Sequence, residues 1–448
     1  MNSIPRVEDW GLENQQGILL VDGASCLDLT RDFGTPLHVV HEKRLLNNIK
    51  RFKDAFSGYQ PGVNVFYSYK SNGIPGVLQL IHRGEKEEEG LGAEVISPYE
   101  LWLALRMGIA PRRIVYNGIN KPLESLKLAL KLKIRINADS IEEVKQIDTE
   151  AKKLGRTCEI GIRVCPRAGW NSHFGLSLAD GQAEQAVDYI SRSSHLLCTG
   201  LMCHLTTRAT DAETHALACF DLLRFASKIH RRYGITIQSL DLGGGFGVPT
   251  VKGFSHWEAL RYRLWNRPPR KPDPSRCQPI EDMAKRIISA LFKGCERFGL
   301  NPPVLCLEPG RIITSDAQVL LLTVGGVKQR GEGRLFALTD GGRFNINYPL
   351  EHEYHAAFVA NKLNDPLRQN YFVVGRLCSP GDWVYRNIHL PCLQAQDILA
   401  IMDSGAYFTQ FSTNFSYPRA AVVAVRDGKA RVLRHRETYE CMVSMDLM

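Results

Sequence analysis

Short apolar runs alternate with longer segments of helical periodicity between about residues 36 and 310. A run of four to eight apolar residues bounded by turn residues is typical of a buried strand, and apolar positions three and four apart are typical of an amphipathic helix. Eight runs of the strand type are found, at residues 63–69, 94–97, 113–118, 134–137, 158–164, 197–205, 237–244 and 304–310. Eight strands with helices between them predict a closed (β/α)8 barrel of the TIM type, with an open doubly wound sheet as the alternative.

The pattern changes after residue 311, where strand-like runs are broken by Gly and Asp turns and helical periodicity is weak. This pattern predicts an all-β barrel or sandwich. We expect the N-terminal segment, residues 1–35, to add strands to this part. The predicted domains are therefore the N-terminal segment 1–35, the barrel 36–310 and the β domain 311–448.

Composition indicates a globular enzyme-sized chain of 448 residues, with 44% hydrophobic and 23% charged residues. No apolar run approaches the roughly 20 residues that span a bilayer, so no membrane association is expected. The first residues lack the features of a secretory signal, and the 12 cysteines form no CxxC pair and no zinc spacing. We therefore expect reduced thiols, a cytoplasmic location and no metal site.

The net charge of +9 includes a basic stretch at residues 261–276, whose prolines predict a surface loop. The sequence has no helix-turn-helix, zinc-finger or RNA-recognition signature, so no nucleic-acid partner is expected. An anionic cofactor or substrate would also use part of the positive charge.

Unusual polar residues stand at the ends of the predicted barrel strands, where the active sites of such barrels lie. Lys70 directly follows the run 63–69. A lysine in this place is often a surface residue whose amine reaches solvent. A desolvated lysine at a strand mouth is also the residue type that forms imines with aldehydes.

Glycines at two further strand ends suggest a phosphate site. Gly243, Gly244 and Gly245 follow the strand SLDL, and Gly310 and Arg311 follow VLCLEP. Consecutive glycines expose backbone N–H groups that a phosphate can approach, although a tight turn also uses glycine. The GxGxxG spacing of a dinucleotide site is missing.

His204 ends the run 197–205 and is followed by Thr206 and Thr207. A histidine at a strand end is more often structural than functional. The neighbouring hydroxyls suit a phosphate, and they favour a functional role.

Together these segments resemble the fold-type III pyridoxal-phosphate decarboxylases, the diaminopimelate, ornithine and arginine decarboxylase group. The resemblance covers about residues 35–425. Its motifs are YSYKSN (67–72), GLGAEVIS followed by Glu100, GGGFG (243–247), EPGR (308–311), CSPGD (378–382) and DSGAY (403–407).

The resemblance implies pyridoxal 5'-phosphate as the cofactor, bound to Lys70 as a Schiff base. It places Glu308 against the pyridine nitrogen, His204 on one ring face and Glu94 near the imine. A carboxylate at the nitrogen would keep the ring protonated and able to accept electrons. The residues implied to hold the phosphate are Gly243, Gly244, Gly245, Thr207, Gly310, Arg311 and Tyr407.

The resemblance also implies that Cys378 returns a proton to the substrate Cα after carbon dioxide leaves. In this family the cysteine segment is offered by a partner subunit, so a homodimer with shared active sites is expected. An inert thiol is the alternative interpretation of Cys378.

The distal substrate region departs from the family pattern. Tyr348 stands where diaminopimelate decarboxylases have an arginine, and Ser379 stands where they have a glutamate; with Asp382 these residues are predicted to line the substrate site. Because an unpaired buried charge is costly, the missing charges argue against a substrate with a second charged head. We predict an amino-acid decarboxylase acting on a modified or conjugated amino acid, with a specialised siderophore or natural-product pathway as one setting.

Four alternatives remain open: diaminopimelate decarboxylase proper, an amino-acid racemase with the same barrel, a non-catalytic homologue serving as a binding module, and a barrel hydrolase with paired carboxylates. The joint presence of Lys70, His204, Glu308 and Cys378 argues against the binding module. No paired acids or metal cluster favour the hydrolase.

Overall fold

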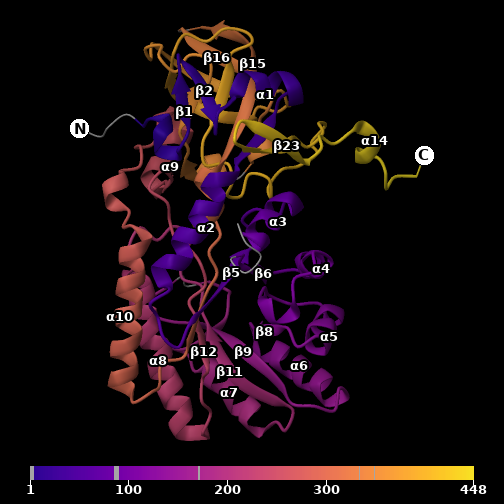
Figure 1. The fold of residues 1–448 in the computed structure, drawn as a ribbon, viewed down its shortest axis with the longest axis vertical. Coiled ribbons are helices and arrows are strands. Elements are labelled where there is room, and N and C mark those ends of the chain that lie inside the picture. The colour runs from indigo at the N-terminus through magenta and orange to yellow at the C-terminus, as the bar shows by residue number, and fades with distance from the viewer. Residues whose placement is uncertain (1–4, 85–89, 170–171, 332, 348, 448) are drawn as a thin grey trace.

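The protein is described by a computed structural model that covers residues 5–84, 90–169, 172–331, 333–347 and 349–447. Two parts follow one another along the long axis of the molecule (Figure 1). Most of the C-terminal strands, together with the N-terminal segment, form one end, and the helix-covered barrel forms the other.

Eight parallel strands form the barrel, and each pairs with the next around a closed ring. Closure is made by β8, which pairs with β7 on one side and with β9 on the other. This confirms the predicted TIM-type barrel. The strands are β5 (Val63–Ser68), β6 (Gly92–Val95), β7 (Ile114–Tyr116), β8 (Arg135–Ala138), β9 (Cys158–Cys165), β11 (Leu196–Met202), β12 (Ser239–Asp241) and β14 (Val304–Leu307).

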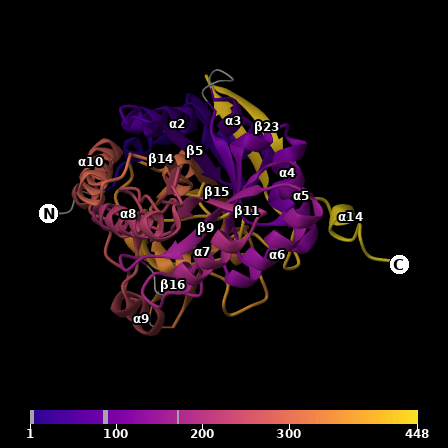
Figure 2. The ribbon, with the colours of Figure 1, turned by 90° about the horizontal axis from the view of Figure 1, so that it is seen from below.

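Helices surround the strands as a ring when the barrel is seen along its axis (Figure 2). Each helix buries an apolar stripe; in α10 the stripe is made by Met283, Ile287 and Leu291, which recur every four residues. The helices are α2 (Glu42–Phe56), α3 (Pro75–Arg83), α4 (Pro98–Arg106), α5 (Leu123–Lys131), α6 (Ile141–Lys153), α7 (Gln182–Arg192), α8 (Glu213–Tyr233) and α10 (Ile280–Phe298). A two-residue strand outside the ring, β10 (Leu176–Ser177), pairs with β9.

A mixed sheet of nine strands forms the main part of the second domain, in the order β20-β19-β16-β15-β4-β22-β23, with β21 and β18 branching from β15. Its strands are β4 (Leu37–His41), β15 (Gln318–Arg330), β16 (Arg334–Thr339), β18 (Ala357–Val359), β19 (Gln369–Val374), β20 (Trp383–Leu390), β21 (Ile398–Ile401), β22 (Ala421–Arg426) and β23 (Lys429–Arg434). The C-terminal part of the chain also has four short helices, α11 (Arg311–Thr314), α12 (Arg343–Ile346), α13 (Pro349–His352) and α14 (Tyr439–Met442).

The N-terminal region differs from the expected division in two ways. The strand β4, expected inside the barrel, lies in the middle of the second sheet between β15 and β22. All five residues of β4 are buried, which requires cover on both faces and explains its central place. The strands β1 (Glu13–Gln15), β2 (Ile18–Val21) and β3 (Ala24–Ser25) form a sheet of their own, and with α1 (Cys26–Phe33) they pack on the core of the second domain.

The basic stretch 261–276 is only partly a loop. Its first residues complete helix α9 (His256–Trp265), which begins with a reciprocal capping box between Ser255 and Glu258. The stretch lies against β20, because Arg386 N donates to the Tyr262 hydroxyl at 2.8 Å and Asn387 Nδ2 donates to Asn266 O at 3.0 Å. Among the residues described, no helix has the length and apolar character needed to cross a bilayer.

A further strand pairing joins the domains. The strand β13 (Lys252–Gly253), which follows β12, pairs with β17 (Glu353–Tyr354), which precedes β18. This pairing brings Glu353 to the edge of the barrel mouth.

Candidate active site

Lys70 and Glu94 form an ion pair at the C-terminal mouth of the barrel. The neighbouring strands β5 and β6 run parallel, so their ends present both side chains to the same space. The Nζ of Lys70 lies 2.7 Å from Oε2 of Glu94, and the Ser68 hydroxyl donates to the same oxygen at 2.5 Å. The Glu94 side chain is only 1% exposed, whereas that of Lys70 is 33% exposed and therefore accessible to a ligand.

Electrostatics keeps both members of this pair charged. Burial opposes the charge on Lys70, but the carboxylates of Glu94 and Glu308 outweigh it and raise the Lys70 pKa. Burial would likewise raise the Glu94 pKa, yet the charge and hydrogen bond of Lys70 lower it. Lys70 therefore needs a proton acceptor before its amine can attack a carbonyl, and Glu94 is within hydrogen-bond distance.

Asn117 connects the two glutamates of the site. Its Nδ2 donates to Glu94 Oε1 at 3.1 Å and to Glu308 Oε1 at 2.5 Å, and its Oδ1 accepts from Asn137 Nδ2 at 2.8 Å. All four side chains are buried. Both asparagines were missed in the sequence, although each stands at a strand end, the criterion that singled out Lys70.

Glu308 lies beside a second buried carboxyl group, Asp241, which the sequence analysis also missed. Burial, followed by the charges of Asp241 and Glu94, raises the pKa of Glu308 well above its ordinary value. Burial raises the pKa of Asp241 to about 6. The atoms Glu308 Oε2 and Asp241 Oδ2 are buried and accept from no N–H or hydroxyl group of the described residues, while the two carboxyl groups are hydrogen-bond partners of one another. The structure thus reveals a pair of acids that the sequence did not indicate.

The glycine run packs three strand ends against one another. A Cβ on Gly244 would lie 2.2 Å from the carbonyl oxygen of Glu308, and one on Gly245 would lie 2.0 Å from that of Thr206. A Cβ on Gly243 would lie 2.6 Å from the carbonyl oxygen of Cys203. No side chain fits at these positions, so close backbone approach accounts for the glycines, whereas the phosphate role stays a prediction.

His204 lies next to this run. Gly244 N approaches its Nδ1 at 3.4 Å, and burial together with the charge of Lys70 holds the His204 pKa well below its usual range. The ring is therefore neutral, as a ring that stacks on an aromatic cofactor can be. Thr207 follows Thr206 in the loop that pairs with the glycine run through Ala209 N and Gly245 O.

Arg311 is held by the second domain. Its guanidinium makes two hydrogen bonds to Glu353, at 2.7 and 2.9 Å, and lies over the Tyr407 ring with 5.2 Å between Cζ and the ring centroid. Arg208 pairs with the same carboxylate. Gly310 packs on Ser71, whose carbonyl accepts from Tyr407 N at 3.3 Å. The structure therefore brings Gly310, Arg311 and Tyr407 together, and it adds Glu353, which no motif in the sequence indicated.

The segment that carries Cys378 lies in the second domain, just before β20. Cys378 is exposed, and it makes no hydrogen bond to Lys70 or Glu94 in the described parts of the chain. Asp382 is buried, and its carboxylate accepts from the backbone N–H groups of Arg343 at 2.7 Å and Leu377 at 2.8 Å, so it shapes the loop. Ser379 is exposed, and Tyr348 lies outside the described residues.

Comparison with known proteins gives consistent matches. Residues 42–315 match the family model described as pyridoxal-dependent decarboxylase, pyridoxal binding domain. The chain is 33% identical to diaminopimelate decarboxylase of Methanothermobacter thermautotrophicus, covering 95% of both chains, and 30% identical to that of Bacillus subtilis, covering 97% of this chain and 96% of the other. The structure is similar to diaminopimelate decarboxylase from M. jannaschii, with a TM-score of 0.85 at 25% identity and 99% coverage of both chains.

The barrel, the second β domain and the lysine at the barrel mouth define a fold-type III enzyme that depends on pyridoxal phosphate. The chain belongs to the pyridoxal-dependent decarboxylase family, and it is an amino-acid decarboxylase. This result favours decarboxylation over the racemase and hydrolase alternatives.

The residues present fit the cofactor. Lys70 supplies an amine, and Glu308 Oε2 is a buried acceptor that a protonated ring nitrogen would satisfy. The glycine run leaves backbone without side chains beside a neutral His204. A carboxyl group for the ring nitrogen and an amine for the aldehyde are the two groups that a pyridine ring with an aldehyde substituent requires.

Proposed function

We propose that this enzyme removes one carboxyl group from diaminopimelate, as the names of its relatives state for them. The observation that carries the proposal is the row of side chains Lys70, Glu94, Asn117 and Glu308 across the barrel mouth, joined by hydrogen bonds of 2.5–3.1 Å. Further support comes from a similar structure, the diaminopimelate decarboxylase from M. jannaschii, which was solved in complex with L-lysine, an amino acid with a distal amine.

The side chains have distinct parts in this reaction. Pyridoxal phosphate, when bound, supplies an aldehyde for the lysine amine and a ring that withdraws electrons from the substrate Cα. Glu94 accepts the proton that Lys70 must lose, since the two are 2.7 Å apart. Glu308, a carboxyl group with a raised pKa, can hold a proton at the far end of the site. His204 stays neutral, so it offers a flat ring without adding charge.

Cys378 is proposed as the acid that protonates the substrate Cα, acting in the active site of a partner subunit. Support comes from its exposure and from the fixed shape of its loop, which Asp382 anchors through two backbone amides. An exposed thiol on a shaped loop is suited to insertion into a second copy of the chain.

A modified or conjugated amino acid is the second candidate substrate. It is favoured by Ser379, which follows the cysteine and is exposed and uncharged. A substrate with a free charged head at its distal end would need a counter-charge there. An acylated or conjugated end would need only hydrogen bonds.

A substrate panel separates the two candidates. Carbon dioxide release would be measured with meso-diaminopimelate, lysine, ornithine, arginine and N-acylated diamino acids, and each product would be checked for its configuration. The first proposal predicts the highest kcat/KM for diaminopimelate. A higher kcat/KM for an acylated or conjugated amino acid would replace it with the second.

Mixed dimers test the shared site. Lys70→Ala and Cys378→Ala subunits are each expected to be inactive alone, Lys70→Ala also lacking the visible absorbance of the lysine-bound cofactor. A mixed dimer places both native residues in one of its two sites, so its activity should recover to about half that of the wild type. Absence of recovery in a verified mixed dimer would contradict shared sites.

A further inference from the structure

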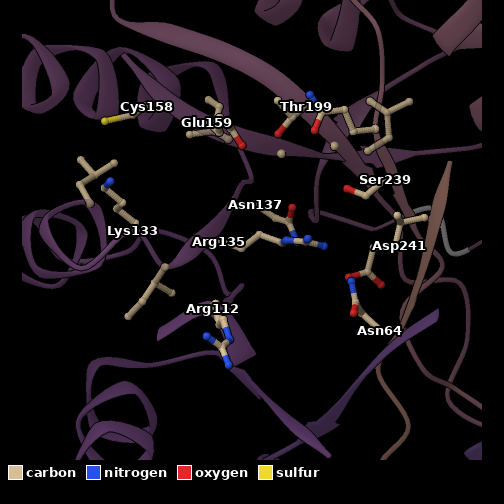
Figure 3. A pocket seen from close by; sticks show the side chains of 18 of the residues that line it. Asn64, Arg112, Lys133, Arg135, Asn137, Cys158, Glu159, Thr199, Ser239 and Asp241 are labelled. Atoms are coloured by element: carbon tan, nitrogen blue, oxygen red, sulfur yellow. The ribbon is translucent and has the colours of Figure 1, made fainter. Parts of the chain in front are cut away.

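The barrel has a second opening at the end opposite to the active site. A cavity of about 630 Å3 begins at the N-terminal ends of the strands and reaches inward to Asn137 and Asp241 (Figure 3). TIM-type barrels are normally filled by layers of bulky side chains. In this barrel Gly161 and Gly200 contribute no side chain to the lining; a Cβ on Gly161 would lie 2.1 Å from Asn137 Oδ1, so this glycine makes room for the asparagine side chain. The size is that of a pocket for a small molecule.

One wall of this cavity, which we call the basic wall, carries four cationic side chains. They are Arg112, Lys133, Arg135 and Arg156. Across the described residues, none of the four has a carboxylate partner at ion-pair distance. Arg135 is instead fixed by the Phe66 ring, 5.8 Å from its Cζ, and by Cys306, whose sulfur lies 2.8 Å from its Nη1. Figure 3 shows its guanidinium extending into the cavity toward Asp241.

The opposite wall is polar but mostly uncharged. Asn64, Thr199, Gln238 and Ser239 line it, and Asp241 lies at its deep end. Asp241 is 3% exposed; its Oδ1 accepts from Gly243 N at 2.9 Å, and the Glu308 side chain is a hydrogen-bond partner of the same carboxyl group. The amide and hydroxyl side chains of this wall are the groups that can pair with hydroxyl groups of a ligand.

We propose that this cavity binds a small organic phosphate that carries hydroxyl groups. The phosphate lies against the basic wall, where arginine offers paired donors to phosphate oxygens. The hydroxyl groups face the amide and hydroxyl side chains of the opposite wall. With four cations against the two acids Glu159 and Asp241, the lining has a net charge of +2, which matches a phosphate dianion.

Two features of the cavity select this ligand class over others. A nucleic-acid strand needs an extended basic stripe, whereas these cations surround one concavity. A simple inorganic anion would use the basic wall but make no contact with the amide and hydroxyl side chains of the opposite wall. A phosphate that also carries hydroxyl groups contacts both walls.

Titration calorimetry on the holoenzyme tests the proposal, since the bound cofactor then fills the phosphate position of the active site. The probes are ribose 5-phosphate, inorganic phosphate and ribose, each at two salt concentrations. We expect ribose 5-phosphate to bind one site per chain, more tightly than either fragment, and more weakly at the higher salt. No saturable binding, or equal affinity for inorganic phosphate, would overturn the proposal.

A matched pair of variants locates the site. Arg112→Gln with Lys133→Gln removes two charges from the rim of the basic wall, and both residues are exposed, so folding should be preserved. We expect affinity for ribose 5-phosphate to fall about 10-fold or more and decarboxylation without the ligand to stay unchanged. Lys145→Gln with Lys152→Gln on α6 removes the same charge outside the cavity and should bind as the wild type does. Equal losses in the two variants would overturn the assigned location.

Discussion

Replacing Asn117 with leucine is expected to damage catalysis more than folding. Leucine keeps the branched shape of asparagine at Cγ, with a larger volume that the control variant below also adds, but it removes the donor to Glu308 at 2.5 Å and the donor to Glu94 at 3.1 Å. A hydrogen bond to a charged acceptor contributes about 1.5–3 kcal/mol. Because this hydrogen bond stabilises the ionised form of Glu308, its loss raises the Glu308 pKa further. If the transition state needs that ionised form, kcat/KM falls about 10- to 150-fold.

The assay is steady-state carbon dioxide release across pH, together with the absorbance of the bound cofactor. The variant should keep the lysine-bound absorbance, because Lys70 still pairs with Glu94, while its activity profile moves to higher pH. Asn48→Leu is the control, since Asn48 Nδ2 also donates to a carboxylate, Asp316, at 2.7 Å and to a carbonyl at 3.0 Å. Activity of Asn117→Leu within threefold of the control would refute this reasoning.

Three further predictions concern single side chains. Cys378→Ala should keep the cofactor absorbance and lose about 100-fold or more in turnover, whereas Cys392→Ala, an equally exposed thiol, should resemble the wild type. Burial raises the pKa of Glu100 to about 7 from 4.5, so the folded state binds a proton that the unfolded state releases. The free energy of unfolding should therefore fall as pH rises from 4.5 to 7. Thermal unfolding at pH 5 and pH 8 should show a smaller fall for Glu100→Gln than for the wild type. Glu353→Gln leaves the buried Arg311 without its counter-charge and should lower the free energy of unfolding by about 3–5 kcal/mol, measured as a lower Tm. The control Glu351→Gln breaks a half-exposed ion pair and should lower it by under about 1 kcal/mol.

The barrel could be predicted from the sequence because its strands are buried on both faces and read as apolar runs. The run at residues 63–69 became β5, and the run at 158–164 became β9. The place of residues 37–41 could not be predicted in the same way. A fully buried strand has the same apolar pattern in a barrel as in a second sheet, and only the pairing with β15 and β22 decides between them.

Lys70 could be singled out from its place at a strand end, whereas Glu94 and Glu308 were indicated only by the resemblance to the decarboxylase family; the structure brings the three side chains together, and their roles stay predictions. Asn117 was missed because Asn-Gly after a strand is also an ordinary turn signal. Glu353 was missed for a different reason: its partner Arg311 is 42 positions away, and no local pattern joins them. Long-range ion pairs of this kind appear only after the chain is folded.

The barrel mouth depends on the second domain as much as on the barrel itself. Asp403, which follows β21, is fully buried and accepts hydrogen bonds from Trp10 Nε1 at 2.7 Å, the Thr250 hydroxyl at 2.8 Å and the Ser315 hydroxyl at 3.1 Å. These donors come from the N-terminal segment, the loop after the glycine run and the end of the barrel. Four residues beyond Asp403, the Tyr407 ring lies against the guanidinium of Arg311. Because one buried carboxyl group ties these segments together, the geometry at the cofactor is set by the docking of the two domains, and a barrel without its partner domain would lack part of its own active site.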